Sequence, residues 1–130
     1  MGQPAAKQGD KITATDTHTV IVPGSPPVKT DVPLPFSGAL DGNLSSDVKI
    51  MGKAAAVVGS TASNSPAHIP PSGASFQSPP SNKGTITTGS STVFINGKAA
   101  ARNGDTAETC NDPKDLPVGK VVATGTVMIG

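Results

Sequence analysis

One nine-residue phrase occurs three times in this chain of 130 residues. It reads GQPAAKQGD at residues 2–10, GKAAAVVGS at 52–60 and GKAAARNGD at 97–105. Each copy opens with glycine, carries a pair of alanines and reaches a second glycine just before its last, polar residue. Such a repeat predicts one small structural unit used three times, because repeated units bury their apolar faces against neighbouring copies.

Branched apolar residues alternate in three places along the chain, at Val48-x-Ile50, Val93-x-Ile95 and Val127-x-Ile129. This pattern predicts short strands that end in tight turns. Two of the strands directly precede the second and third copies of the phrase, whereas the third lies at the end of the sequence and the first copy has none before it. We therefore expect a circularly permuted unit, whose two halves meet when three repeats close around an axis.

A row of three units is the alternative to a closed ring. A row would leave sheet edges exposed at both ends, and exposed edges promote aggregation, so closure is the expected arrangement. A second class of strand is predicted at HTVIVPG (18–24), GTITTG (84–89) and GKVVATG (119–125). No segment shows sustained helical periodicity, so the predicted fold is all-β, with one domain over residues 1–130.

Two segments between the repeats, residues 23–41 and 63–83, are rich in proline, serine and glycine. Proline removes backbone donors and interrupts regular elements, so these segments are expected to be long loops. The whole chain has 15 glycines, 13 prolines and only 2% aromatic residues, which is little material for a conventional side-chain core. A fold held mainly by backbone hydrogen bonds, with a metal ion as a further tie, fits this composition.

The charged residues are scattered, and the formal net charge is +1. There is no basic run, so nucleic-acid binding is not expected. We find no transmembrane segment and no signal peptide, and we expect synthesis in the cytoplasm without a cleaved signal. A single cysteine excludes an intrachain disulfide.

The chain has two histidines and one cysteine, distributed one to a repeat: His18, His68 and Cys110. Each histidine lies nine residues after the last glycine of its copy, and the cysteine lies six residues after the corresponding glycine. In a closed ring such positions converge near the axis, and imidazole nitrogen with thiolate sulfur suits zinc, with iron as the alternative. Taken singly, a histidine is more often a hydrogen-bonded residue and a lone cysteine a small buried apolar one.

Structural zinc sites normally have four protein ligands, and the histidines and the cysteine supply three. Asp16, Asp112 or a water molecule are the candidates for the fourth position. The sequence leaves this choice open.

The repeated phrases resemble those of the PAAR-repeat proteins, which are named after a Pro-Ala-Ala-Arg motif. The closest match is Pro4-Ala5-Ala6-Lys7, and STVFINGKAAARNGD at 91–105 is the most specific stretch. The resemblance implies a small cone with a metal at its apex that caps a trimeric β-helical spike. Such tips belong to contractile injection machines: type VI secretion systems, phage-like tails and related particles.

Carried onto this chain, the family's zinc site implies the ligands His18, His68 and Cys110, one histidine fewer than the usual set. The implied partner is a trimeric spike protein, VgrG-like or phage-hub-like, with one tip per trimer. Effector toxins as cargo and a target membrane are further implied partners, and no enzymatic activity is expected. Six residues of the short strands are the candidates for the docking base: Val48, Ile50, Val93, Ile95, Val127 and Ile129.

Two other classes of function are considered. A zinc hydrolase would need an open coordination position and a general base, for which Glu108 and Asp112 flank Cys110. A β-repeat binding module without metal would need no such cluster.

Overall fold

The computed structural model describes residues 2–130, which form strands and no helix. No helix in this range is therefore long and apolar enough to cross a membrane. The strands, in chain order, are β1 (Gln3–Pro4), β2 (Lys11–Val22), β3 (Val28–Gly42), β4 (Lys49–Ile50), β5 (Lys53–Ala54), β6 (Thr61–Asn64), β7 (Ser75–Phe76), β8 (Lys83–Ile86), β9 (Phe94–Ile95), β10 (Lys98–Ala99), β11 (Thr106–Thr109), β12 (Leu116–Val122) and β13 (Met128–Ile129).

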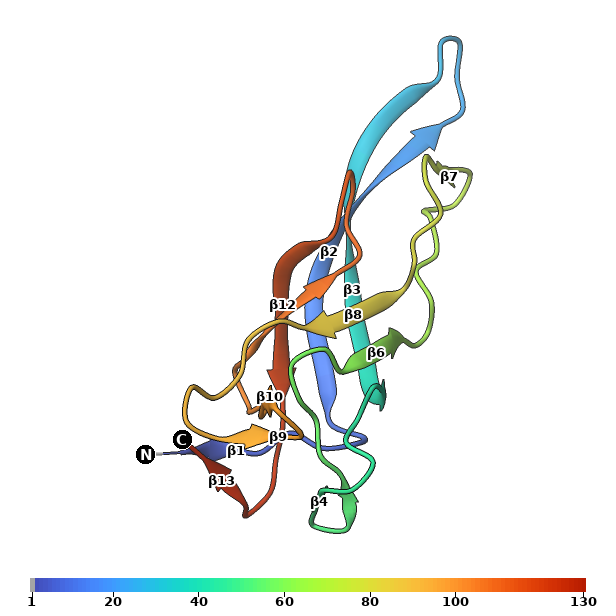
Figure 1. The fold of residues 1–130 in the computed structure, drawn as a ribbon. Helices are drawn as coiled ribbons and strands as arrows, with labels where there is room; N and C mark the ends of the chain where they lie inside the picture. Colours follow the sequence, from blue (N-terminus) through green and yellow to red (C-terminus); the bar gives the residue numbers. More distant parts are fainter. Residues whose placement is uncertain (1) are drawn as a thin grey trace.

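Six of these strands close into a barrel (Figure 1). Their order is β12-β11-β8-β6-β3-β2, and β12 pairs back onto β2 through Lys120↔Thr13 and Val122↔Lys11. Every neighbouring pair is antiparallel. β7 adds to β2 outside this ring. The predicted closed all-β fold is confirmed.

Three short hairpins form the base below the barrel: β4–β5, β9–β10 and β13–β1. The third hairpin joins the two ends of the sequence, with Gln3 opposite Ile129 in the register that Lys53 and Ile50 have in β4–β5. The first and last strands thus pair as the repeats predict, and β1 and β13 lie side by side in Figure 1.

A ring of three backbone hydrogen bonds links the repeats at the second alanine of each phrase. The amide of Ala6 donates to the carbonyl of Ala101 (2.9 Å), Ala101 donates to Ala56 (3.1 Å), and Ala56 donates to Ala6 (3.0 Å). All three side chains are at most 1% exposed. Three backbones can approach one axis this closely only where side chains are small, which explains the repeated alanine pair.

A further set of equivalent bonds ties this ring to the barrel wall. The second glycine of each phrase donates its amide to a core residue of a neighbouring strand: Gly9 to Leu40, Gly59 to Ile86 and Gly104 to Val121. The ring therefore fixes the position of three barrel strands, β3, β8 and β12.

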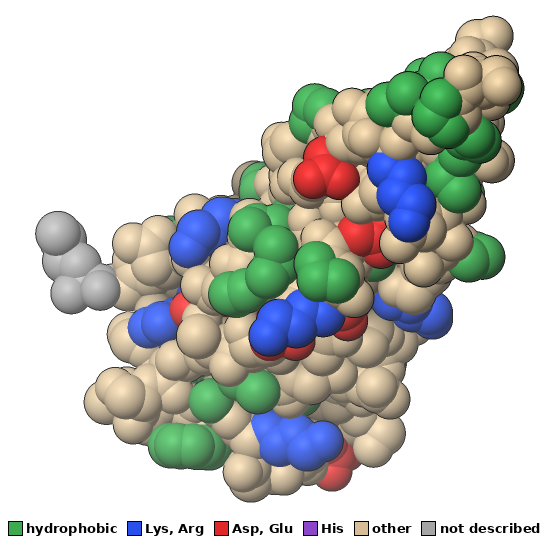
Figure 2. All heavy atoms as spheres, turned by 90° about the horizontal axis from the view of Figure 1, so that it is seen from above, with side chains coloured by type: hydrophobic (Ala, Val, Ile, Leu, Met, Phe, Trp, Pro, Cys, Tyr) green, Lys and Arg blue, Asp and Glu red, His purple; other side chains and the backbone are tan. Residues whose placement is uncertain are grey.

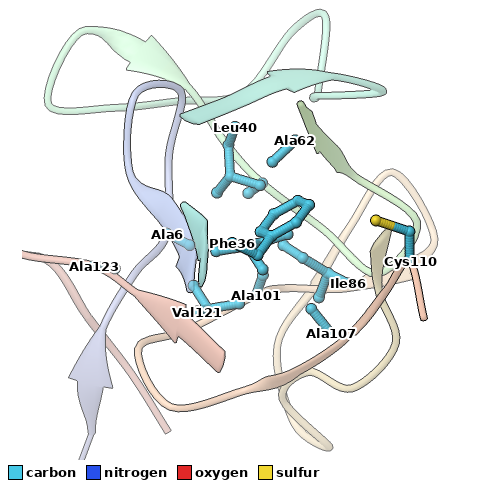
Figure 3. Packing of buried hydrophobic residues seen from close by; sticks show 12 residues of the cluster. Ala6, Phe36, Leu40, Ala62, Ile86, Ala101, Ala107, Cys110, Val121 and Ala123 are labelled. Carbon is cyan, nitrogen blue, oxygen red and sulfur yellow. The ribbon is translucent and has the colours of Figure 1, made fainter. Parts of the chain in front are cut away.

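The core lies inside the barrel, and the first repeat supplies its largest side chains (Figure 3). Phe36 and Ile12 are almost fully buried, whereas the positions equivalent to Ile12 in the other repeats carry alanine. A Cβ atom at Gly84 would lie 3.2 Å from Phe36 Cζ, so glycine on β8 makes room for the ring. The chain fills a small barrel with one aromatic residue and many alanines.

The expectation of a loop over residues 23–41 is wrong for most of that segment, because β3 spans Val28–Gly42. Pro33 and Pro35 share one side of the strand, so their missing donors fall on the same edge. β6 pairs with β3 at Gly38–Gly42, beyond both prolines. The outer parts of β2 and β3 continue past the barrel as a two-stranded arm, seen at the top of Figure 1. Between residues 63 and 83 the chain is irregular apart from strand ends and β7, as expected.

One position of the repeat differs in the second copy. Lys7 and Arg102 extend along the base, where Lys7 Nζ donates to the carbonyl of Thr124 and Arg102 Nη2 to that of Gly89 (3.4 Å). Val57 occupies the equivalent place and is too short to do so. An open pocket of about 300 Å³ remains beside it, lined by Asn43, Leu44, Ser45, Ser46, Val57, Ile95, Asn96 and Lys98.

We expect Ala101→Val to destabilise the fold by about 1–3 kcal/mol, because extra methyl groups at the ring force the three backbones apart. Thermal unfolding checks this, with Ala67→Val at an exposed position as the matched control. Equal melting temperatures for the two variants would contradict the close approach at the axis.

Candidate metal centre

Four buried side chains come together where the arm leaves the barrel: Asp16, His18, His68 and Cys110. Each offers one ligand atom, and these atoms all lie within 4.8 Å of one another. The structure thus brings together the three residues predicted from the sequence and adds Asp16. Asp112 lies outside the group of four, at the edge of His18.

Local structure explains the convergence. Asp16 and His18 are two residues apart on β2, so they point to the same, inner face of the strand. Cys110 directly follows β11, and the next residues are tied to β2, since Asn111 Oδ1 accepts from the amide of Thr17 (2.7 Å). Asp112 donates its amide to the carbonyl of Thr17 (2.9 Å).

His68 is held on the loop after β6 by asparagines. Asn82 Oδ1 accepts from its backbone amide (2.8 Å), and Asn64 Nδ2 lies 3.2 Å from Nδ1. Because an amide nitrogen can only donate, this contact places the proton of the metal-free imidazole on Nε2, and ligation of a metal through Nε2 requires that proton to leave this atom. That proton is donated to Asp16 Oδ2, 2.8 Å away. Nε2 is therefore the ring atom that faces the cluster.

His18 is the group that a metal would satisfy best. Its side chain is 1% exposed, and over the described part of the chain neither ring nitrogen has a hydrogen-bond partner. Nδ1 lies 3.5 Å from Asp112 Oδ2, within ion-pair range but without hydrogen-bond geometry. The ring packs against His68 and Phe76, with centroids 5.0 and 5.7 Å away. Buried polar atoms without partners are rare and destabilising, so ligation is the natural use of this imidazole.

Asp16 is fully buried, and hydrogen bonds to both of its carboxylate oxygens fix its orientation. Oδ1 accepts from the Thr109 hydroxyl and from Asn111 Nδ2 (3.4 Å). Oδ2 faces the other cluster members, accepting from His68 Nε2 and from Cys110 Sγ at 3.5 Å. A buried carboxylate normally requires a charged or hydrogen-bonded partner, and a cation bound here would provide one.

Burial, with a smaller contribution from the neighbouring Asp16 carboxylate, raises the pKa of the Cys110 thiol to about 11, while hydrogen bonds from the backbone of Asn82 and Lys83 oppose the shift. The thiol therefore stays protonated at neutral pH unless a cation displaces its proton. Two imidazoles, a thiolate and a carboxylate are a donor set that suits zinc, and the residues present fit such an ion.

The enclosed geometry favours a structural over a catalytic site. All four ligand residues are buried. Glu108, one of the two candidate bases for a hydrolase, is exposed, whereas its neighbours on β11, Ala107 and Thr109, are buried. Successive side chains of a strand point to opposite faces, so Glu108 faces away from the cluster.

The six predicted base residues divide by exposure. The isoleucines at positions 50, 95 and 129 are buried in a second apolar cluster. This cluster also contains the first alanine of each pair, at positions 5, 55 and 100, and Val48 packs against it. The exposed apolar side chains of the base hairpins are Met51, Val93, Phe94, Val127 and Met128. Met51, Phe94 and Met128 lie next to the alternating pairs, are also apolar, and are not among the six predicted residues.

Residues 76–130 match a family model described as the PAAR motif. The match confirms the resemblance seen in the repeated phrases, and this part of the chain carries the PAAR motif. The motif supports a spike-tip role in contractile injection systems and implies association with a spike protein. The equivalent bonds of Gly9, Gly59 and Gly104 extend the repeat to the part of the chain before residue 76. No curated protein and no solved structure matches the chain.

The raised pKa of Cys110 predicts how the metal-free protein responds to alkali. In the unfolded chain the thiol ionises near its ordinary pKa of 9.0, and in the folded chain at about 11. The folded state thus retains a proton that the unfolded state loses, so stability falls as pH rises above 9. Between pH 8 and pH 10 we expect a loss of roughly 1 kcal/mol.

Urea unfolding in the presence of a chelator measures this loss, and Cys110→Ala is the control that removes it. The same pH dependence in parent and variant would show that the buried thiol is not the cause.

Proposed function

We propose that this chain is the tip of the spike of a contractile injection machine, and that it caps the blunt end of a trimeric spike protein, VgrG-like or phage-hub-like. The observation that carries the proposal is the closed ring of three equivalent repeats. A base with approximate threefold symmetry offers a similar surface to each chain of a trimer. Residues 1–130 then act as one domain, carried outside the producing cell with the particle.

The base hairpins supply the docking surface in this proposal. Phe94 on β9 and Met128 on β13 occupy equivalent positions and are 60% and 56% exposed. Large exposed apolar residues of this kind mark interaction sites. Their neighbours Val93 and Val127 extend the same surface, while the buried isoleucines behind them keep the hairpins rigid.

The metal centre serves rigidity. One ion held by Asp16, His18, His68 and Cys110 would join β2, the loop after β6 and the end of β11, three segments far apart in the chain. Zinc is the ion proposed, with iron as the alternative, and its role when bound is that of a structural cross-link. Because all four candidate ligand residues are buried, the proposal includes no hydrolytic activity.

A tip that is narrow and stiff concentrates the force of contraction on a small area of the target membrane. We therefore propose an aid to puncture as the mechanical role of the chain. The irregular segment 63–83 lies on the surface and is the proposed place for attached cargo.

We expect one zinc ion per chain in the purified protein. His18→Ala and Cys110→Ala should each lose the ion and melt about 10 °C or more below the parent, because structural zinc contributes several kcal/mol to folding. Elemental analysis and thermal unfolding with and without chelator measure both effects. Glu108→Gln is the matched control and should keep the ion. Variants that melt like the parent under both conditions would rule out the metal centre.

The isolated chain should be a monomer, since its own repeats close the ring, and should bind one spike trimer. Light scattering of a mixture with the trimeric spike protein of the same injection system gives the ratio. Phe94→Asp with Met128→Asp should weaken binding roughly tenfold or more. The control, Val118→Asp on the barrel wall, should leave binding unchanged. A homotrimer of the isolated chain would be incompatible with the proposal.

A further inference from the structure

The end of the molecule beyond the metal centre carries almost no charge. Residues 19–28 and 69–82 contain no Asp, Glu, Lys or Arg, although 15% of the chain is charged. The two segments lie side by side, since β7 pairs with β2 through Val20↔Phe76, and Gln77 donates its amide to the carbonyl of Thr19 (3.0 Å). We call these two segments together the uncharged tip.

The uncharged tip exposes apolar side chains. Val22 is 40% exposed and Val28 58% exposed on the arm, and Ile69 on the neighbouring loop is 72% exposed. Figure 2 shows green side chains along the projecting arm, and neither blue nor red at its outer end. The Lys, Arg, Asp and Glu side chains of this view lie away from that outer end.

The backbone of the uncharged tip is also poor in donors. It contains seven prolines, at positions 23, 26, 27, 70, 71, 79 and 80, and proline has no N–H group. The turn of the arm, residues 23–27, holds three of them and is exposed throughout. Moving a backbone into an apolar medium costs free energy chiefly because its N–H and C=O groups lose hydrogen bonds to water. This turn has fewer N–H groups than an ordinary turn, so its transfer costs less.

The nearest charges lie on β3, beside the inner part of the uncharged tip. Lys29 stands opposite Ile21 on the arm, and Asp31 Oδ1 accepts a hydrogen bond from Thr19 Oγ1 (2.7 Å). A lysine at this place can extend its amine to the level of lipid phosphates while its stem stays with the apolar residues. Charged side chains deeper in a bilayer would oppose entry strongly, and the uncharged tip has none.

We propose that the uncharged tip binds the surface of a phospholipid bilayer on its own, with Val22 and Val28 at the end of the arm entering the interface between head groups and acyl chains. Apolar area and the absence of charge drive this contact, so it needs no anionic lipid. The contact extends the proposed function by naming what the tip meets first, and rests on that function only for its role in delivery. The site lies at the opposite end of the molecule from the base hairpins (Figure 1).

The chain has no tryptophan, so a single Val28→Trp reports on the environment of the arm. With vesicles of pure phosphatidylcholine we expect its emission to shift to shorter wavelength and to be quenched by lipids brominated in the acyl chains. The control Val118→Trp lies on the barrel wall at similar exposure, 44% in the parent, and should show neither effect. Adding Val22→Asp to the Val28→Trp reporter should reduce the vesicle-bound fraction about tenfold.

The absence of a shift for Val28→Trp would overturn the proposal and leave a protein surface as the occupant of the tip. Equal shifts in both reporters would also overturn it, as would binding that requires anionic vesicles and disappears in high salt, since lysines would then explain it. Val22→Asp with Val28→Asp should bind the spike trimer as the parent does, because the base is untouched. Failure of vesicle binding is thus separable from failure of trimer docking.

Discussion

Three peptide groups hydrogen-bonded in a circle, those of Ala6, Ala56 and Ala101, are the constraint on which the rest of the structure depends. Each bond joins two repeats, so none of the repeats can form its part of the ring alone. The circle places β3, β8 and β12 through the adjoining glycine amides, and these strands define the barrel. Backbone polar groups that are paired so completely replace much of the stabilisation that large apolar side chains give in other small domains.

Above the ring the repeats diverge, and that divergence brings together the four residues of the candidate metal centre. The first repeat contributes a long arm with Asp16 and His18, the second a loop with His68, and the third a strand end with Cys110. The ligands therefore come from three places that the ring has already brought near one axis. A cluster assembled in this way needs no local motif, because the fold itself supplies the spacing.

Much of this could be predicted from the sequence. The repeated phrase and the strand Val127-x-Ile129 at the end of the chain predicted a closed fold in which the two ends of the sequence pair. Aligning the glycines of the three phrases was enough, because it shows which residues occupy equivalent positions. One ligand in each repeat pointed to His18, His68 and Cys110. Asp16 could not be separated from Asp112, because the choice depends on which face of β2 and of the segment after β11 each side chain occupies.

Two features could not be predicted, for physical reasons. Residues 28–42 form a strand in spite of Pro33 and Pro35, because both prolines lie on an edge where no donor is required. Whether a side chain of a two-residue strand is buried, as Ile95 is, or exposed, as Phe94 is, depends on the layer packed behind it. Alternation alone does not say which of the two faces that layer covers.

The hollow beside Val57 makes the three sides of the base distinguishable. Lys7 takes the corresponding place in the first repeat and Arg102 that in the third, whereas the shorter Val57 lines the pocket in the second. A partner with perfect threefold symmetry would present the same shape three times and meet a different side chain at each place. The three sides of the base are therefore not equivalent. Rotating the molecule by one third of a turn relative to such a partner yields a different complex.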